Sequence, residues 1–237
     1  MSYLDFNKHT SNEYNEELED IRNLLLNMGG MVEKQLQKAM QALLQGNIKL
    51  SKKVVKKDLG INAMEVKIDE ECTQIIAKRQ PAASDLRLII AVIKSITDLE
   101  RIGDEAAKIA KCSQYLISKK YECDYFSEIE KLAAVVESNL SLSLNALARL
   151  DADEALKVAI NDMTVDTEFE RVNKNLINYM STNHNDLDKI VRLSWAAKSL
   201  EKIGDHTTNI CEYIIYLVKG KDIRHMDLNV IKEEYFS

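Results

Sequence analysis

Apolar residues recur every three or four positions along most of this chain, which is the period of an amphipathic α-helix. The clearest stripes lie in two segments, 85–112 and 188–211. Each segment contains one signature, LERIGD at 99–104 and LEKIGD at 200–205, and the two copies are offset by 101 residues. A duplicated unit is therefore our first hypothesis.

The apolar pattern of the first part predicts three helices. The first helix begins near Glu13 and ends near Gly46-Asn47, and it contains the pair Gly29-Gly30. Because glycine inside a helix costs about 1 kcal/mol relative to alanine, this pair indicates close contact with another helix or a bend. The second helix covers about 48–78 and the third about 85–118.

The single proline of the chain, Pro81, separates the second helix from the third, and Ser84 is placed to cap the third. Three further helices are expected over the stripes at 132–147 and 156–179 and after His184-Asn185. An offset of 104 residues aligns the early parts of the two halves. The later change to 101 indicates that three residues were lost before the sixth helix.

These patterns predict an all-α fold of two tandem three-helix bundles related by internal duplication. The first bundle covers 13–120 and the second covers 121–220. We expect a loose arm at 1–12, because it shows no periodicity, and a tail at 221–237.

The composition supports long helices, because seven glycines and one proline leave few residues for the turns of a strand-rich fold. The net charge of −6 implies no broad cationic surface, so binding to nucleic acid or anionic lipid is not expected. No run approaches the ~20 apolar residues of a membrane span, so any membrane association is expected to go through a partner.

The four cysteines form no CxxC pair, and the chain opens with a polar stretch, MSYLDFNKHT. A cytosolic protein with reduced cysteines is the simplest interpretation. Because Cys72, Cys112 and Cys211 lie in helical patterns, core packing is favoured over a redox role for them.

The signatures also contain the candidate chemistry. Glu100 and Asp104 lie four residues apart on one helix face, as do Glu201 and Asp205. Two carboxylates at the margin of an apolar stripe repel each other, so a metal ion or a basic partner is needed to offset them. Ordinary salt bridging is the alternative, because the chain contains other acidic pairs with this spacing, such as Glu65/Asp69.

The repetition of the pairs favours a metal. Asp162 and Asp166 lie four apart on the preceding helix of the second half, and the first half has Asp58 and Asn62 there. Adjacent helices could bring these oxygen donors together, which suits Mg²⁺, Mn²⁺ or iron. His206 follows the second signature and is expected either to contact a metal or to make a polar contact between helices.

A catalytic role is not expected. No Ser/His/Asp grouping can be assembled from four scattered histidines, and neither half has the Glu-x-x-His pattern of di-iron bundles. Gly103 and Gly204 lie inside helices, where a close helix crossing explains them better than a phosphate loop. The remaining alternatives are a metal-dependent hydrolase or oxidase on a helical bundle, and a purely structural protein without metal.

The sequence resembles the PhoU family, the cytosolic regulators of bacterial phosphate uptake and signalling. The resemblance is carried by RQPAASDLRLIIAVIKSITDLERIGDEAAKIA and LEKIGDHTTNI, together with MGGMVE at 28–33 and DLGIN at 58–62. It extends from about Glu13 to Lys219 and implies two three-helix bundles, commonly a homodimer, and an acidic E/D-x-x-x-D motif in each half. It further implies that these motifs can hold a multinuclear cluster of iron, zinc, manganese or magnesium.

The resemblance also implies a function and partners. The expected protein is a non-enzymatic cytoplasmic repressor of phosphate-starvation signalling and phosphate uptake. Its implied partners are a membrane sensor histidine kinase of the phosphate regulon and the ATPase of a Pst-type phosphate ABC transporter.

The family motif carries over onto eight residues of this chain. They are Glu100, Asp104, Asp58, Asn62, Glu201, Asp205, Asp162 and Asp166. The chain departs from the family pattern at Glu105, where a histidine is common, and at Lys202, where an arginine is common. Because Lys108 stands where the second half has Asn209, we expect the first site to hold fewer metal ions or to have an ammonium group in place of one.

Overall fold

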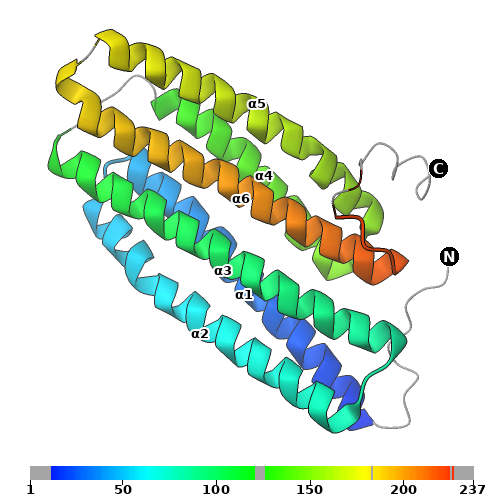
Figure 1. The fold of residues 1–237 in the computed structure, drawn as a ribbon. Coiled ribbons are helices and arrows are strands. Elements are labelled where there is room, and N and C mark those ends of the chain that lie inside the picture. Colours follow the sequence, from blue (N-terminus) through cyan, green and yellow to red (C-terminus); the bar gives the residue numbers. More distant parts are fainter. Residues whose placement is uncertain (1–11, 121–125, 183, 225, 227–237) are drawn as a thin grey trace.

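The computed structural model describes residues 12–120, 126–182, 184–224 and 226, and it confirms the all-α fold (Figure 1). Within these residues the chain forms six long α-helices, one 3₁₀ turn and no strand. The helices are α1 (Asn12–Leu44), α2 (Ile48–Arg79), α3 (Ala83–Ser118), α4 (Phe126–Arg149), α5 (Ala152–Thr182) and α6 (Leu187–Lys219), with the 3₁₀ turn His184–Asp186 before α6.

The expected features at the two chain ends and at the connection fall largely outside the described residues. The N-terminal arm is described only at Asn12, and the tail only as far as residue 226, with residue 225 left out. Most of the connection between the two halves, 121–125, also lies outside the described residues.

The arrangement of the helices follows the duplication. Helices α1, α2 and α3 pack together, and α4, α5 and α6 pack together (Figure 1). Contacts between the halves join α3 to α6, the most extensive helix pair, and α1 to α4. Within the described residues, α2 and α5 contact only helices of their own half and therefore lie on the outside.

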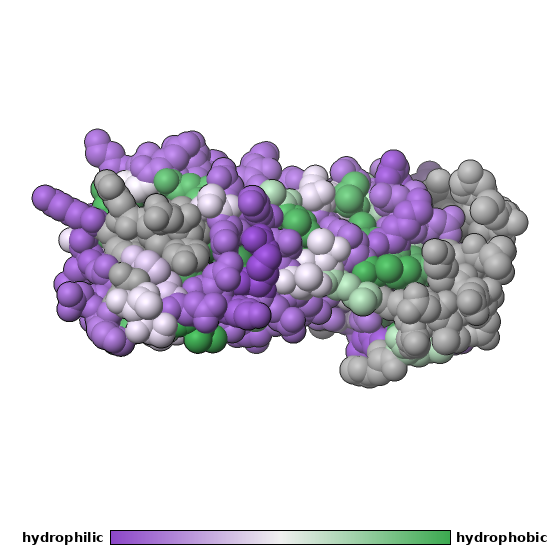
Figure 2. Space-filling view, turned by 90° about the horizontal axis from the view of Figure 1, so that it is seen from above, coloured by the Kyte–Doolittle hydropathy of each residue, from purple (hydrophilic) through white to green (hydrophobic). Residues whose placement is uncertain are grey.

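One hydrophobic core extends through both halves. Its members come from all six helices and include Ile21 and Ile61 of the first half and Leu176 and Ile203 of the second, all at most 1% exposed. Burying one large aliphatic side chain contributes about 1.5–3 kcal/mol, so this shared core stabilises the six long helices together. On the face shown in Figure 2, hydrophilic residues dominate and apolar residues form small separate spots.

One glycine of the pair in α1, Gly29, lies at a close contact between helices, whereas a Cβ added at Gly30 would meet nothing within 4 Å. α1 runs through Gly29 and Gly30 without a break. A Cβ atom on Gly29 would lie 2.6 Å from Cδ2 of Leu144 on α4. The prediction of close helix contact is confirmed, because any larger residue there would displace Leu144.

The turn between α1 and α2 forms as expected, but the cap of α3 does not. Gly46 has φ +63°, a left-handed conformation that favours glycine, and the side chain of Asn47 accepts a hydrogen bond from the Leu50 N–H at 3.1 Å. The prediction that Ser84 caps α3 is wrong. Ala82 occupies the cap position in an extended conformation, so Ser84 already lies inside the helix.

The cysteines of the helices are core residues, as predicted. Cys72, Cys112 and Cys211 are buried and form no disulfide. Burial raises the pKa of the Cys72 thiol to about 12, so it stays protonated at neutral pH. The remaining cysteine, at position 123, lies outside the described residues. Within the described part of the chain, no helix combines the length and the apolar character needed to cross a membrane.

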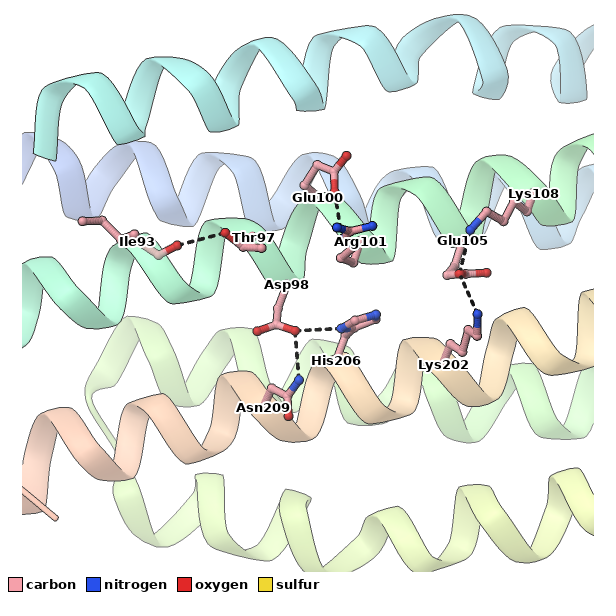
Figure 3. Close-up of polar contacts among 10 residues, drawn as sticks. All are labelled: Ile93, Thr97, Asp98, Glu100, Arg101, Glu105, Lys108, Lys202, His206 and Asn209. Carbon is pink, nitrogen blue, oxygen red and sulfur yellow. Dashed lines mark hydrogen bonds and ion pairs between the residues drawn. The ribbon is translucent and has the colours of Figure 1, made fainter. Parts of the chain in front are cut away.

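A polar seam joins α3 to α6 at the centre of the molecule (Figure 3). Nδ1 of His206 lies 2.7 Å from Oδ1 of Asp98, and Asn209 donates to the same oxygen at 3.0 Å. His206 thus makes the polar contact between helices that was the alternative to a metal ligand. The two departures from the family pattern also meet here, because Lys202 lies 3.7 Å from the buried carboxylate of Glu105.

A bidentate ion pair joins the start of α1 to the end of α2. Arg79 donates to both carboxylate oxygens of Glu17, each at 2.9 Å, and its Nη2 also lies 3.1 Å from Glu13. The hydrogen bonds from Arg79 lower the pKa of Glu17. The folded state therefore favours the ionised form of this carboxyl group.

This ion pair predicts a pH-dependent stability. Replacement Glu17→Gln is expected to lower Tm by about 1–3 °C at pH 7, because it removes a partly exposed ion pair. Since the pKa of Glu17 is lowered on folding, the ion pair stabilises at high pH and its effect disappears as the pH falls below about 4. Thermal unfolding from pH 3 to 8 measures this, with the exposed Glu16→Gln as control. A Tm difference that is independent of pH would contradict the assignment.

Candidate metal centre

The first acidic cluster lies where α2 packs against α3. It contains Asp58 of α2 and Glu100 and Asp104 of α3, all half-buried. A Cβ atom on Gly103 would lie 3.0 Å from Cδ1 of Ile61 and 3.5 Å from Oδ1 of Asp58. Gly103 therefore lets α2 approach α3 closely enough to place Asp58 beside the two carboxylates of the signature.

The second half repeats this crossing between α5 and α6. A Cβ atom on Gly204 would lie 3.0 Å from Cγ1 of Val165 and 3.1 Å from Oδ1 of Asp162. Asp162 is thereby brought to Glu201 and Asp205 of the second signature. The prediction that the signature glycines allow a close helix crossing is confirmed in both halves.

In the first cluster, burial and neighbouring carboxylates disfavour the ionised forms of Asp58 and Glu100. Burial raises the pKa of Asp58, and the charge of Asp104 raises it further, although a hydrogen bond from Gln35 acts in the opposite direction. Burial also raises the pKa of Glu100, assisted by the charges of Asp104 and Glu65. Arg101, with Nε 3.7 Å from Glu100, offsets only part of this effect.

The second cluster shows the same electrostatics. Burial is the main cause that raises the pKa of Asp162 to about 6, and the charges of Asp166, Asp205 and Glu201 contribute to this shift against a hydrogen bond with Thr208. Partial burial and the charges of Glu201 and Asp166 likewise raise the pKa of Asp205. The structure thus brings together all four predicted residues of this half, with Asp166 the exposed outer member.

Two of the predicted ligand residues, one in each half, have a buried oxygen without a hydrogen-bond partner among the described residues. These atoms are Oδ1 of Asn62 and Oε2 of Glu201. Leaving a buried acceptor unpaired costs about 1–3 kcal/mol, so such atoms usually have a ligand or a partner. Glu201 lies among the carboxylates of the second cluster, and Asn62 lies one helical turn after Asp58, so a cation held at either position would have an acceptor to bind.

The donor set fits a hard or borderline cation in its chemistry, because it consists of carboxylate and amide oxygens. Across the described residues, no group of three or more histidine, cysteine, aspartate or glutamate side chains is arranged to hold a metal ion. Binding of a metal would therefore require these side chains to close around it.

Two residues near the first cluster were missed in the sequence. Glu65 of α2 adds a fourth carboxylate, and its spacing of seven residues from Asp58 places both on one helix face. Gln35 of α1 is 6% exposed and donates to Oδ1 of Asp58 at 2.8 Å and to the carbonyl oxygen of Gly103 at 3.2 Å. A polar residue inside the apolar stripe of α1 was the available signal.

The side chain of Lys108 bonds Glu105 and not a carboxylate of the first cluster. Nζ of Lys108 bonds Glu105 at 2.8 Å, on the side of α3 that faces α6 (Figure 3). The ammonium group closest to a signature carboxylate is instead in the second half, where Lys198 donates to Glu201 Oε1 at 2.6 Å. The reason for ranking the first site below the second is therefore removed.

Comparison with known proteins supports the duplication and the fold. A family model described as "PhoU domain" matches this chain twice, over residues 25–113 and 129–214. The chain is similar to the "Phosphate-specific transport system accessory protein PhoU homolog" of Pseudomonas aeruginosa, with 46% identity over 95% of this chain and 93% of the relative. It is 42% identical, over the same shares of both chains, to the "Phosphate-specific transport system accessory protein PhoU" of Escherichia coli K12.

Two solved structures resemble the fold. The crystal structure of PhoU from Pseudomonas aeruginosa matches with a TM-score of 0.86 and 46% identity, covering 88% of this chain and all of that chain. The phosphate transport system regulatory protein PhoU from Streptococcus pneumoniae matches with a TM-score of 0.81 and 26% identity, over 88% of this chain and 98% of that chain. With two matches to the family domain, close relatives along nearly its whole length and the same helical fold, this chain belongs to the PhoU family.

Proposed function

We propose that this chain is a non-enzymatic cytoplasmic regulator that restrains phosphate uptake and phosphate-starvation signalling when phosphate is plentiful. The observation that carries the proposal is the acidic cluster repeated in both halves of a PhoU-family chain. Relatives at 42–46% identity are named as accessory proteins of phosphate-specific transport, which supports a regulatory role in that system.

The surface beside the clusters supports contact with partner proteins. Leu59 of α2 is 72% exposed and Met163 of α5 is 73% exposed. The two residues occupy equivalent positions in the two halves, each next to the first aspartate of its cluster. We propose that the partners are the membrane sensor histidine kinase of the phosphate regulon and the ATPase of the phosphate ABC transporter, and that the chain reaches the membrane only through them.

The regulatory proposal predicts a deletion phenotype. A strain lacking this protein is expected to express alkaline phosphatase and phosphate-uptake genes at elevated levels in phosphate-rich medium, because the restraint on starvation signalling is lost. Enzyme assays and transcript levels measure this, with a strain complemented by the intact gene as control. Unchanged expression in the deletion strain would overturn the proposal.

We further propose that each cluster binds metal as part of a multinuclear site of iron, zinc, manganese or magnesium. In the first half Asp58, Asn62, Glu100 and Asp104 would hold it, and in the second Asp162, Asp166, Glu201 and Asp205 would. Bound cations would neutralise the repulsion within each cluster, and the two unpaired buried oxygens would be available to bind them.

Metal content tests this assignment. Replacing Glu201 and Asp205 by alanine is expected to remove the metal of the second cluster while the fold survives, because these side chains lie at the edge of the core. Replacing Glu100 and Asp104 should remove a similar amount, since each half contributes four oxygen-donor side chains, with Asn62 in the place of the fourth carboxylate in the first half. Elemental analysis compares both variants with the wild type and with a control in which Glu16 and Asp20, an exposed acidic pair of α1, become alanine.

Equal metal content in all four proteins would defeat the site assignment, and no metal in any of them would favour ordinary salt bridging. The alternative of a metal-dependent hydrolase or oxidase is tested on the same preparations. Turnover of phosphate esters by the metal-loaded wild type, lost in either double variant, would replace the regulatory proposal by that alternative.

A homodimer is also proposed, because the family resemblance favours it and exposed apolar side chains are available to bury. Ile177 of α5 and Trp195 of α6 are 56% and 51% exposed. Light scattering at micromolar concentration is expected to give twice the chain mass of 27.0 kDa. A mass of one chain under these conditions would rule the dimer out.

A further inference from the structure

A lysine-rich groove lies between α1 and α2, outside the acidic clusters. It has a volume of about 660 Å³, which is within the usual size of a small-molecule site. The lysines that line it are Lys34 and Lys38 of α1 and Lys53, Lys56 and Lys57 of α2. We call this surface the lysine groove.

No carboxylate is among the residues that line the groove, although Asp58 of the first acidic cluster lies beside it. From residue 34 to residue 57 the chain contains seven lysines and no aspartate or glutamate, although its net charge is −6. Among the described residues, none of the five groove lysines forms an ion pair. Because like charges three or four residues apart on a helix destabilise it, an anionic ligand is the natural compensation.

The second half provides an internal comparison. With the offset of 104 residues, the five lysine positions correspond to Ser138, Leu142, Lys157, Ile160 and Asn161. One lysine remains, and its ammonium lies 3.3 Å from Glu154. The duplicated helix pair thus folds without the lysines, so the fold does not require them.

The floor of the groove is apolar. Met31, Val54 and Ile61 line it, and a Cβ added at Gly60 would lie in ordinary van der Waals contact with Cε of Met31, at 3.8 Å. The lysine stems add further apolar surface while their ammonium groups reach the rim. A suitable ligand therefore combines several negative charges with a flat apolar part.

The groove borders the first acidic cluster. Gln35 lines the groove and donates to Asp58 of the cluster at 2.8 Å. Ile61 also lines it, and this side chain packs against Gly103 at the helix crossing. A ligand in the groove would thus touch residues that hold the α2–α3 crossing in place.

We propose that the lysine groove binds a nucleoside polyphosphate, with the phosphates at the lysine rim and the base on the apolar floor. Phosphate oxygens accept hydrogen bonds from lysine ammonium groups, and an apolar floor favours contact with an aromatic base over contact with water. Nucleic acid is a poorer fit, because the basic surface is one short groove on an acidic protein.

Isothermal titration calorimetry with ATP, inorganic tripolyphosphate and adenosine tests this proposal. The wild type is expected to bind ATP at least five times more tightly than tripolyphosphate, and adenosine most weakly. Replacing Lys53, Lys56 and Lys57 by glutamine should weaken ATP binding at least tenfold. The control replaces the exposed Lys131, Lys157 and Lys174 of the second half by glutamine, which changes the net charge equally and should leave binding unchanged.

A second variant tests the contribution of the apolar floor separately from that of the lysines. Gly60→Leu fills the floor without removing a lysine and keeps the helix, so it should weaken ATP binding several-fold and tripolyphosphate binding much less. Circular dichroism verifies that each variant is folded. The proposal is overturned if the wild type does not bind ATP, if tripolyphosphate binds as tightly as ATP, or if both lysine triples lose binding equally. Binding to single-stranded RNA or anionic lipid vesicles without binding to ATP would also overturn it.

Discussion

The close crossing of an outer helix with a central helix, at Gly103 in one half and at Gly204 in the other, is the constraint on which the candidate sites depend. A Cβ atom at either position would come within about 3 Å of a branched side chain of the outer helix. Because glycine has no Cβ atom, the outer helix can come close enough to place Asp58 or Asp162 among the carboxylates of the signature. The apolar packing of the crossing thus supplies the free energy that holds like charges together.

The two halves are joined by a seam whose polar contacts follow the duplication only in part. Positions 105 and 206 are equivalent, yet Glu105 faces lysines whereas His206 faces Asp98. Each arrangement satisfies a buried group with a partner of suitable charge or hydrogen-bonding character. Lys202 of α6 lies 3.7 Å from Glu105 of α3, so these two residues form an ion pair across the seam, next to the closer pair of Glu105 with Lys108.

Side chains of like charge gather on two sides of α2, negative on one side and positive on the other. On one side the charge of Asp104 acts on Asp58, and on the other side Lys53, Lys56 and Lys57 line the lysine groove. Gln35 lies between them and hydrogen-bonds Asp58. A cation on the acidic side and a polyanion on the basic side would each offset one of these groups of like charge, and both would act on the same helix pair.

The periodicity of the apolar residues determined the six helices, their approximate ends and the duplication, because each depends on local spacing that is visible along the chain. It also identified the signature carboxylates and the packing role of their glycines. The tertiary structure alone decided which side chains meet. Lys108 bonds Glu105. Two further residues, Glu65 and Gln35, lie at the first cluster. Lysines from two helices line one groove. These outcomes depend on how the helices are rotated and crossed, which is determined by contacts between residues far apart in the sequence.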